Sequence, residues 1–243
     1  VVGVMEGSDY PNEARRIPRV GGPSVIDLEV LMSLKPDLVV AWASGNPPAQ
    51  IAKLRALGVP VFMSEPQKLK DIPVSMVKLG QLAGTRASAQ AAALHFEKRV
   101  SALPQSRHGA VPVRVFYQIW QSPIMTVNDN HIISDVLRFC GAENVFGKES
   151  ALTPTISMEA ALSTNPELLV STRATRPDEP DWLAPWLPWR HVGAVARKNF
   201  CEVNPDWMSR AGPRLIDGAE ELCACVEQAR LKRPVSAPPT PRR

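Results

Sequence analysis

The N-terminal third of the chain alternates short apolar runs with segments of helical periodicity. Residues 37–42 (DLVVAW) form a continuous apolar run, as expected for a parallel strand covered on both faces. Residues 27–34 predict a short helix, because Asp27 is a good N-cap and leucines follow at helical spacing. Further strands are predicted at 1–5 and 59–63, and helices at 49–57 and 69–82. This alternation indicates a mostly parallel sheet.

The longest helical pattern spans residues 85–103 (TRASAQAAALHFEKRVSAL), which contain neither glycine nor proline. Its residues are mostly strong helix formers, so the segment predicts one helix of about five turns and about 28 Å. Ala91, Leu94, Val100 and Leu103 fall near one face. The helix is either a rod that joins two α/β lobes or an ordinary surface helix of a single sheet.

The region after this helix repeats the alternation. Strands are predicted at 113–120, 167–172 and 200–203, and helices at 131–139, 158–162 and 209–230, the last with Pro213 near its first turn. The segments LKPDLVVAW (34–42) and NPELLVST (165–172) share a helix end, a proline, an acidic residue and an apolar strand. This weak internal repeat favours two lobes of similar plan.

The predicted organisation therefore has four parts. An N-terminal α/β lobe covers residues 1–84, a connecting helix covers 85–104, a C-terminal α/β lobe covers 105–230, and a tail covers 231–243. The tail is rich in proline and arginine, a composition typical of disorder.

Composition excludes few classes of protein. The chain has 243 residues and a net charge of +4, with basic residues scattered or in the tail, so no basic patch indicates nucleic-acid binding. No run approaches the roughly 18 to 20 apolar residues of a membrane helix. The chain shows no signal peptide and begins with a strand pattern, VVGVM. We therefore expect either a cytosolic protein or a chain that begins after a leader.

Four cysteines are present, Cys140, Cys201, Cys223 and Cys225, and no two of them form a CxxC pair. The CAC spacing at 223–225 does not match common zinc sites. Two alternatives remain, buried thiols or an oxidised pair, and the latter would imply an extracytoplasmic compartment.

Motifs of catalysis are absent from the sequence: it contains no GxSxG, no phosphate-binding glycine loop and no HExxH. The histidines, His95, His108, His131 and His191, are far apart and lack metal-ligand spacing. The sequence thus predicts neither an enzyme nor a metal site.

Aromatic and polar residues gather instead at strand ends and in loops: Tyr10, Trp42, Tyr117, Trp120, Trp182, Trp186, Trp189, Asp206, Trp207 and Arg210. In open parallel sheets, ligands bind outside the carboxyl ends of the strands. Two such lobes would line a cleft with flat apolar surfaces and a few polar anchors, which suits a large, partly apolar ligand. The alternative is that these aromatics pack in the core.

Several segments carry a resemblance to a known family, in order over nearly the whole chain: VVGVMEGSDYP (1–11), DLEVLMSLKPDLVVAWASGN (27–46), LRALGVPVF (54–62), VRVFYQIWQSPIMTVNDNHIISDVLRFCGAENVF (113–146) and NPDWMSRAGPRLIDGAEELC (204–223). The chain resembles the periplasmic vitamin B12 (cobalamin)-binding proteins of ABC importers, a branch of the helical-backbone binding proteins. LKPDLV is shared by the wider group, whereas SDYP, AWxxGN and DWxxRxxPR are more specific to the cobalamin branch.

The resemblance implies two Rossmann-like lobes joined by one rigid helix, with cobalamin between them. Tyr10, Trp42, Asp206, Trp207 and Arg210 match cleft residues of the family, and Trp120 is a further candidate. The resemblance also implies a disulfide between Cys140 and Cys223, while it leaves the state of Cys201 and Cys225 open. The family's first strand and helix, which precede VVGV, have no counterpart in this sequence.

The implied function is a non-enzymatic, monomeric solute-binding protein, periplasmic or membrane-tethered, that delivers cobalamin to an ABC permease dimer. No catalytic cofactor and no nucleic acid are expected. The nearest alternative keeps the fold and binds haem, for which Tyr10 is a possible axial ligand, or a ferric siderophore. An alternative of another class is a metabolic enzyme on two Rossmann-like lobes, although the sequence lacks a nucleotide-phosphate loop and cluster cysteines.

Overall fold

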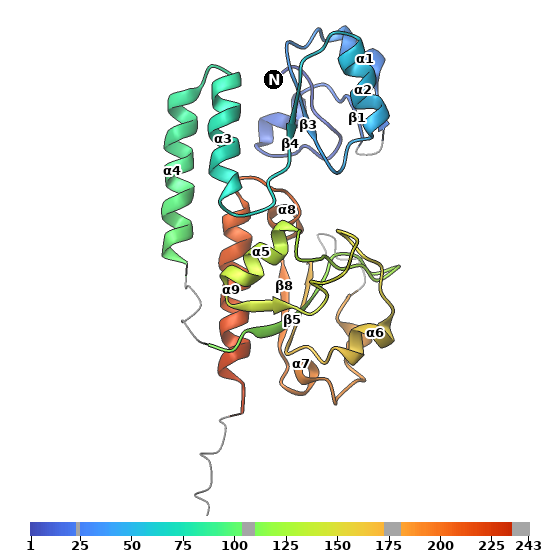
Figure 1. Ribbon diagram of the computed structural model, residues 1–243, viewed down its shortest axis with the longest axis vertical. Coiled ribbons are helices and arrows are strands. Elements are labelled where there is room, and N and C mark those ends of the chain that lie inside the picture. Colours follow the sequence, from blue (N-terminus) through green and yellow to red (C-terminus); the bar gives the residue numbers. More distant parts are fainter. Residues whose placement is uncertain (23–24, 104–109, 173–180, 235–243) are drawn as a thin grey trace, which may run out of the picture. The chain divides into compact units, whose positions relative to one another are not determined.

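The computed structural model describes residues 1–22, 25–103, 110–172 and 181–234. Its contacts divide the chain into two compact units, Val1–Glu65 and Pro66–Arg243, here called the N-terminal and C-terminal units (Figure 1). His108, the predicted boundary at 104–105 and residues 235–243 of the predicted tail lie outside the described residues. The predicted lobe limits stay a prediction.

The N-terminal unit is built on a two-stranded parallel sheet. Strand β3 (Val39–Trp42) pairs with β4 (Val61–Ser64), in a register that sets Trp42 opposite Ser64. The other elements of this unit are η1 (Asn12–Arg16), β1 (Gly21–Gly22), β2 (Val25–Ile26), α1 (Leu28–Ser33) and α2 (Pro48–Ala56). Helix α1 is capped as predicted, because the Asp27 carboxylate accepts the Val30 N–H at 2.9 Å.

Two expectations for this unit are wrong. Residues 1–5 form only an isolated parallel bridge between Val4 and Arg19, since Pro18 in the partner segment has no N–H to extend a ladder. Strand β3 is not covered on both faces: Ala41 is buried, whereas Val40 and Trp42 are 52% and 53% exposed. Its apolar run therefore supplies both a core face and an exposed aromatic.

The C-terminal unit contains a four-stranded parallel sheet in the order β6-β5-β7-β8. Its strands are β5 (Val113–Gln118), β6 (Ala142–Asn144), β7 (Leu168–Thr172) and β8 (Phe200–Val203). Its helices are α3 (Asp71–Leu82), α4 (Arg86–Ala102), α5 (Ile132–Phe139), α6 (Met158–Ser163), η2 (Ala184–Trp186), α7 (Gly193–Ala196), α8 (Pro205–Met208) and α9 (Leu215–Leu231). Strands β5, β7 and β8 were predicted, whereas β6 and α7 are too short to leave a clear pattern.

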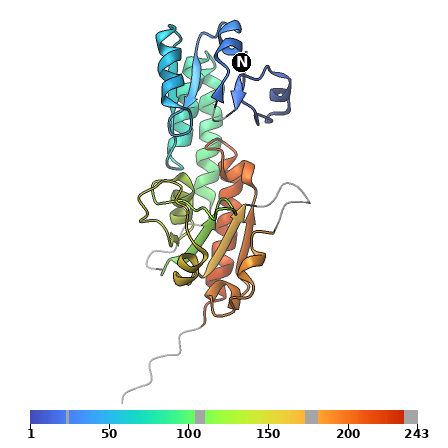
Figure 2. The ribbon, with the colours of Figure 1, turned by 90° about the vertical axis from the view of Figure 1, so that its right-hand side faces the viewer.

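The two faces of this sheet carry separate cores. Alternate residues of β5, Val115 and Tyr117, pack with α5 and with α9, the long orange-red helix of Figure 2. Phe116 points to the opposite face and packs with Ala161 of α6 and Trp186 of η2. The sheet is thus the middle of three layers, which leaves the ends of its strands as the place where a ligand can reach it.

Helix α4 confirms the limits predicted for the long helix, but only the C-terminal half of the predicted buried face, Val100 and Leu103. Ala93, Phe96 and Leu103 are buried, whereas Leu94 and Ala91 are exposed. The alanine-rich sequence is only weakly amphipathic, so tertiary packing decided which side is covered. That side joins the core shared with α3 and α9, and Arg99 reinforces it with ion pairs to Asp217 and Glu220 at 2.7 and 2.8 Å.

The predicted closing helix at 209–230 starts later than expected. The structure has a short α8 ending at Met208 and a separate α9 beginning at Leu215. Pro213 lacks an N–H and restricts the residue before it, so the chain cannot remain helical through this point. The break matters, because it sets α8 apart at the end of β8.

Candidate functional site

Trp42 lies at the carboxyl end of β3 in the N-terminal unit, half exposed. The Trp42 backbone N–H donates to the Asn46 side-chain oxygen at 2.7 Å, and the Trp42 carbonyl accepts the Asn46 N–H at 3.0 Å. These two bonds close the turn after the strand. Glu65 follows β4 and accepts the Trp42 indole N–H at 3.3 Å. Both the backbone and the ring of Trp42 are therefore held from within the same unit.

Tyr10 lies in the loop that precedes η1 and is 62% exposed. Arg19 holds this loop, because its guanidinium donates to the carbonyls of Met5 and Ser8 at 3.1 and 2.9 Å. Such charge-assisted bonds restrain a loop more firmly than neutral ones. An exposed aromatic side chain on a restrained loop is a suitable contact for a ligand.

Asp206, Trp207 and Arg210 lie in and just after α8, at the carboxyl end of β8. Asn204 caps α8 by accepting the Asp206 N–H at 2.9 Å, and Asp206 pairs with Arg210 at 2.8 Å. A Cβ added to Gly218 of α9 would lie 2.5 Å from the Met208 sulfur and 3.3 Å from the Trp207 Cβ. The glycine thus lets α8 approach α9 closely and so places Trp207.

Trp120 follows β5 and is 54% exposed. Its indole N–H donates to the Ser122 carbonyl at 3.1 Å, and its ring meets that of Trp182 edge to face at 6.1 Å. Because the strands of the sheet are parallel, Trp120 and Trp207 belong to the same edge of the C-terminal unit.

Two of the aromatics considered in the sequence pack in the core instead. Tyr117 is fully buried, and this burial raises the pKa of its phenol above the ordinary value. Trp186 is also fully buried and lies 5.1 Å from Phe116 between ring centroids. The candidate residues thus form two groups, Tyr10 with Trp42 and Asp206–Arg210 with Trp120. That these groups face one another across a cleft stays a prediction.

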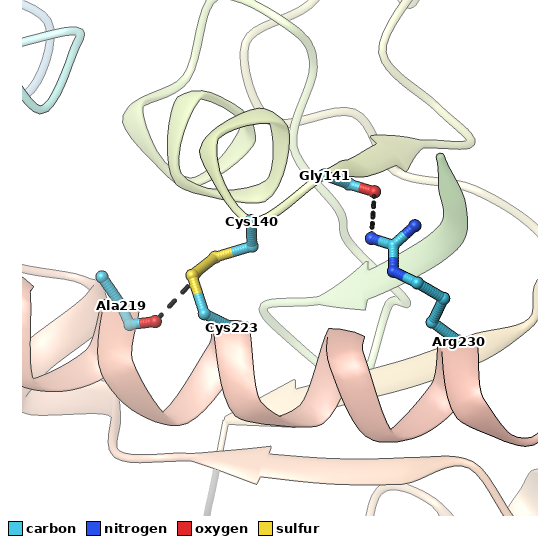
Figure 3. Close-up of a disulfide and its surroundings, with 5 residues drawn as sticks. All are labelled: Cys140, Gly141, Ala219, Cys223 and Arg230. Carbon is cyan, nitrogen blue, oxygen red and sulfur yellow. Dashed lines mark hydrogen bonds between the residues drawn. A yellow bond between two sulfur atoms is a disulfide. The ribbon is translucent and has the colours of Figure 1, made fainter. Parts of the chain in front are cut away.

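Two disulfides brace the C-terminal unit. Cys140 at the end of α5 is joined to Cys223 of α9, as the resemblance implied (Figure 3). Cys201 of β8 is joined to Cys225 of the same helix, a pairing that the sequence left open. The strand that leads to Trp207 is therefore covalently attached to α9.

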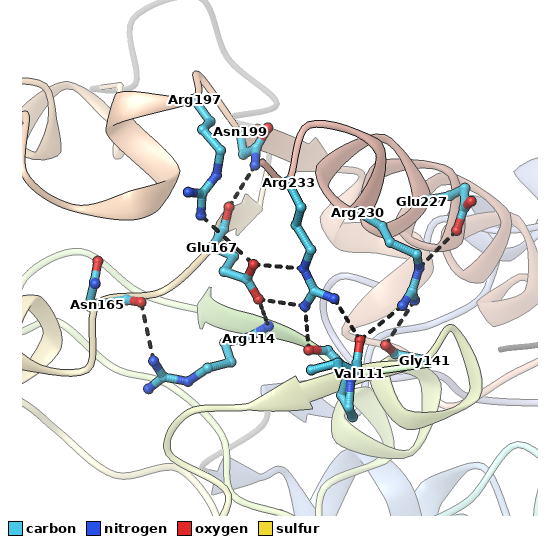
Figure 4. Close-up of polar contacts among 11 residues, drawn as sticks. Val111, Arg114, Gly141, Asn165, Glu167, Arg197, Asn199, Glu227, Arg230 and Arg233 are labelled. Atoms are coloured by element: carbon cyan, nitrogen blue, oxygen red, sulfur yellow. Dashed lines mark hydrogen bonds and ion pairs between the residues drawn. The ribbon is translucent and has the colours of Figure 1, made fainter. Parts of the chain in front are cut away.

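Glu167 anchors the opposite, amino edge of this sheet and was not singled out in the sequence (Figure 4). It accepts two hydrogen bonds from Arg233, at 2.8 and 2.7 Å, and one from the Arg114 N–H at 3.1 Å. Burial acts to raise the pKa of this carboxyl, but its bonds to Arg233 and Arg114 and the charge of Arg197 lower the pKa overall. The end of α9 is thus tied to the start of β7.

The described residues contain no group of three or more His, Cys, Asp or Glu side chains arranged to hold a metal ion. In the same part of the chain, every helix is too short or too polar to span a bilayer. The candidate site is therefore one of aromatic surfaces with a carboxylate and a guanidinium.

Comparison with known proteins identifies the family. Residues 1–206 match the family model described as periplasmic binding protein. The chain belongs to this family. This periplasmic binding protein is 35% identical over 234 residues to the vitamin B12-binding protein of Vibrio parahaemolyticus, covering 96% of the chain and 84% of the relative. It is 32% identical over 236 residues to that of Yersinia pestis, covering 97% and 81%.

Solved structures agree with this assignment. The periplasmic vitamin B12 binding protein of Vibrio cholerae superposes on the present structure with a TM-score of 0.86 at 32% identity. The match covers 94% of the present chain and 89% of the Vibrio cholerae chain. A periplasmic haem-binding protein, BhuT, superposes with a TM-score of 0.78 at 22% identity, covering 94% and 89%, which shows a shared fold alone. The predicted α/β class with two lobes and parallel sheets is confirmed.

Proposed function

We propose that this protein is a solute-binding protein that captures cobalamin or a related corrinoid and delivers it to an ABC permease, without catalysing a reaction. The observation that carries the proposal is the similarity to named vitamin B12-binding proteins, at 32% to 35% identity over at least 94% of the chain. The aromatic and polar side chains at the strand ends are the chemistry that such a ligand needs.

The proposed contacts of the N-terminal unit are apolar. Trp42 offers a half-exposed indole ring, and Tyr10 offers a phenol on a restrained loop. Flat aromatic surfaces suit the broad, largely apolar faces of a corrin ring and its attached base. These contacts supply affinity at a reduced entropic cost, because the Trp42 ring and the loop that carries Tyr10 are already held.

The proposed contacts of the C-terminal unit combine an aromatic ring with a polar pair. Asp206 and Arg210 place an acceptor and a donor 2.8 Å apart. A primary amide has both an N–H donor and a carbonyl acceptor, so it can bond to the two side chains at once. The amide groups around a corrin meet this requirement, with Trp207 and Trp120 as neighbouring apolar contacts.

We place the protein in the periplasm, after which its family is named, either free or tethered to the membrane. The pairing of all four cysteines supports an oxidising compartment, because disulfides persist in the periplasm and are rare in the cytosol. The partner is an ABC permease dimer, and we propose that the free protein is monomeric.

Titration calorimetry with cyanocobalamin tests the proposal, with hemin and a ferric siderophore as parallel titrants. We expect saturable binding of one cobalamin per chain and much weaker binding of the other two. Absence of cobalamin binding would refute the proposed ligand, and tight binding of hemin alone would assign the protein to haem, with Tyr10 as the candidate axial ligand.

A further inference from the structure

Glu65 bonds to three groups of the Trp42 turn. One carboxylate oxygen accepts the Trp42 indole N–H at 3.3 Å and the Ser44 hydroxyl at 2.9 Å, and the other accepts the Ser44 backbone N–H at 2.7 Å. The turn after β3 is thereby fastened to the end of β4. No motif in the sequence marks Glu65 as a neighbour of the candidate ligand residues; the pairing of β3 with β4 brings it there.

The Trp42 ring also packs against the backbone of Gly45, in the turn that follows β3. A Cβ added to Gly45 would lie 1.9 to 2.4 Å from three atoms of the indole, so the ring lies against the glycine backbone. Its backbone is fixed by the pairing of Trp42 with Ser64 and by the two bonds to Asn46. The remaining freedom of a half-exposed tryptophan is rotation of its ring, and the bond to Glu65 restrains that rotation.

The bond to Glu65 also determines what Trp42 offers a ligand. The indole has a single N–H and no acceptor. With that N–H bonded to Glu65, the ring presents its apolar face and cannot donate to a ligand without breaking an existing bond. This arrangement favours stacking and apolar contact.

We propose that Glu65 is a positioning residue that holds the Trp42 indole in the orientation required for stacking against the ligand. The inference rests on the proposed function, since it assumes that Trp42 contacts cobalamin. Pre-orienting a contact residue raises affinity, because less side-chain freedom is lost on binding.

A double-mutant cycle between Glu65 and Trp42 tests the inference. Glu65→Ala should weaken cobalamin binding about three- to tenfold, the effect typical of one orienting hydrogen bond. Glu65→Gln keeps an oxygen that can accept the indole N–H and should restore most of the affinity. In a Trp42→Phe background, which has no N–H to hold, Glu65→Ala should change the affinity less than about twofold.

The matched control is Asp27→Ala, which removes another carboxylate of the same unit that caps α1 and has no bond to Trp42. It should leave cobalamin affinity unchanged even where it lowers the melting temperature. A general loss of stability on removing a carboxylate is thus separated from a specific effect on Trp42.

A spectroscopic readout measures positioning without ligand. Of the indole N–H signals in a ¹⁵N-labelled sample, the Trp42 signal is assigned by its loss in Trp42→Phe. It should shift or broaden in Glu65→Ala and stay near its original position in Asp27→Ala. An unchanged Trp42 signal, or an equal affinity loss in both backgrounds, overturns the inference. If the wild type binds no cobalamin, the proposed function fails, whereas the signal still decides the role of Glu65.

Discussion

Replacing Cys201 and Cys225 together by alanine removes the disulfide that the sequence left unassigned. Cys201 is buried in β8, and Cys225 packs against the same core from α9, so alanine keeps both positions apolar. Within the described residues neither sulfur makes a hydrogen bond, so the main change is the loss of the covalent link between strand and helix.

The expected cost follows from the length of chain that the disulfide closes. The two cysteines are 24 residues apart, for which the chain-entropy model gives about 3.5 kcal/mol. Cys140 and Cys223 are 83 residues apart, and the same model gives about 4.5 kcal/mol. For a unit of this size, each kcal/mol shifts the melting temperature by about 2 to 4 °C. We therefore expect a loss of about 7 to 14 °C for the Cys201–Cys225 pair.

Thermal unfolding followed by circular dichroism measures this loss, with urea unfolding as a second determination. The Cys140→Ala, Cys223→Ala variant serves as the comparison and should be the less stable of the two. A thiol count in denaturant should find no free thiol in the wild type and four after reduction. Cobalamin affinity below the melting transition should be retained, because Asn204 and Gly218 still place Trp207.

Three results would contradict this reasoning. An unchanged melting temperature would mean that the link does not constrain the unfolded chain. A larger loss for the Cys201–Cys225 pair than for the Cys140–Cys223 pair would mean that native contacts, not loop length, set the cost. Loss of cobalamin binding at a temperature where the variant remains folded would mean that the disulfide itself positions Trp207.

Two further predictions concern single residues. Trp207→Ala should weaken cobalamin binding by about 1 to 3 kcal/mol, as expected for a central aromatic contact, and Trp207→Phe should keep part of the affinity. If calorimetry gives the wild type and both variants the same affinity, Trp207 is not part of the site. Glu167→Gln should lower the free energy of unfolding by about 1 to 2 kcal/mol at pH 7, because the charged hydrogen bonds to Arg233 are lost. The control Glu227→Ala, which removes a surface ion pair with Arg230, should change the free energy of unfolding little. Because the folded-state pKa of Glu167 is lowered, its contribution to the free energy of unfolding is complete above the unfolded-state pKa and disappears as the pH falls through the folded-state pKa. The urea midpoints of the wild type and Glu167→Gln should therefore converge in acid.

The sequence predicted the structure best where helix propensity and a helix-breaking residue in the same segment define an element. The limits of α4 could be predicted, because its residues favour helix and Pro104 follows it closely. Its buried face could be predicted only at the C-terminal end, at Val100 and Leu103. Further up, alanine on every side leaves tertiary contacts to choose Ala93 and Phe96 over Ala91 and Leu94. The late start of α9 had a visible cause in Pro213, but a proline is also compatible with the first turn of a helix that begins at Ser209.

The candidate aromatics show the same limit at the level of single residues. Tyr117 and Trp120 lie close in the sequence, yet one is buried and the other half exposed. Tyr117 lies within β5 and faces the core with Val115, whereas Trp120 lies beyond the last residue of the strand. A sequence pattern that locates a strand to within two residues cannot decide between these positions, so core and rim aromatics remained indistinguishable.

Glu65 could have been found by one further step, from strand register. Once β3 and β4 are taken as parallel neighbours, equal alignment of their apolar runs sets Trp42 opposite Ser64. The next residue along β4 then reaches the turn that follows Trp42, and a carboxylate at that point meets the only indole N–H of that turn. The same reasoning applies to Asn204, which follows β8 and caps the helix that carries Trp207. In both units the residue just beyond a strand end bonds to the segment that carries the aromatic side chain proposed to contact the ligand, so these supporting residues are where affinity can be altered without removing a contact.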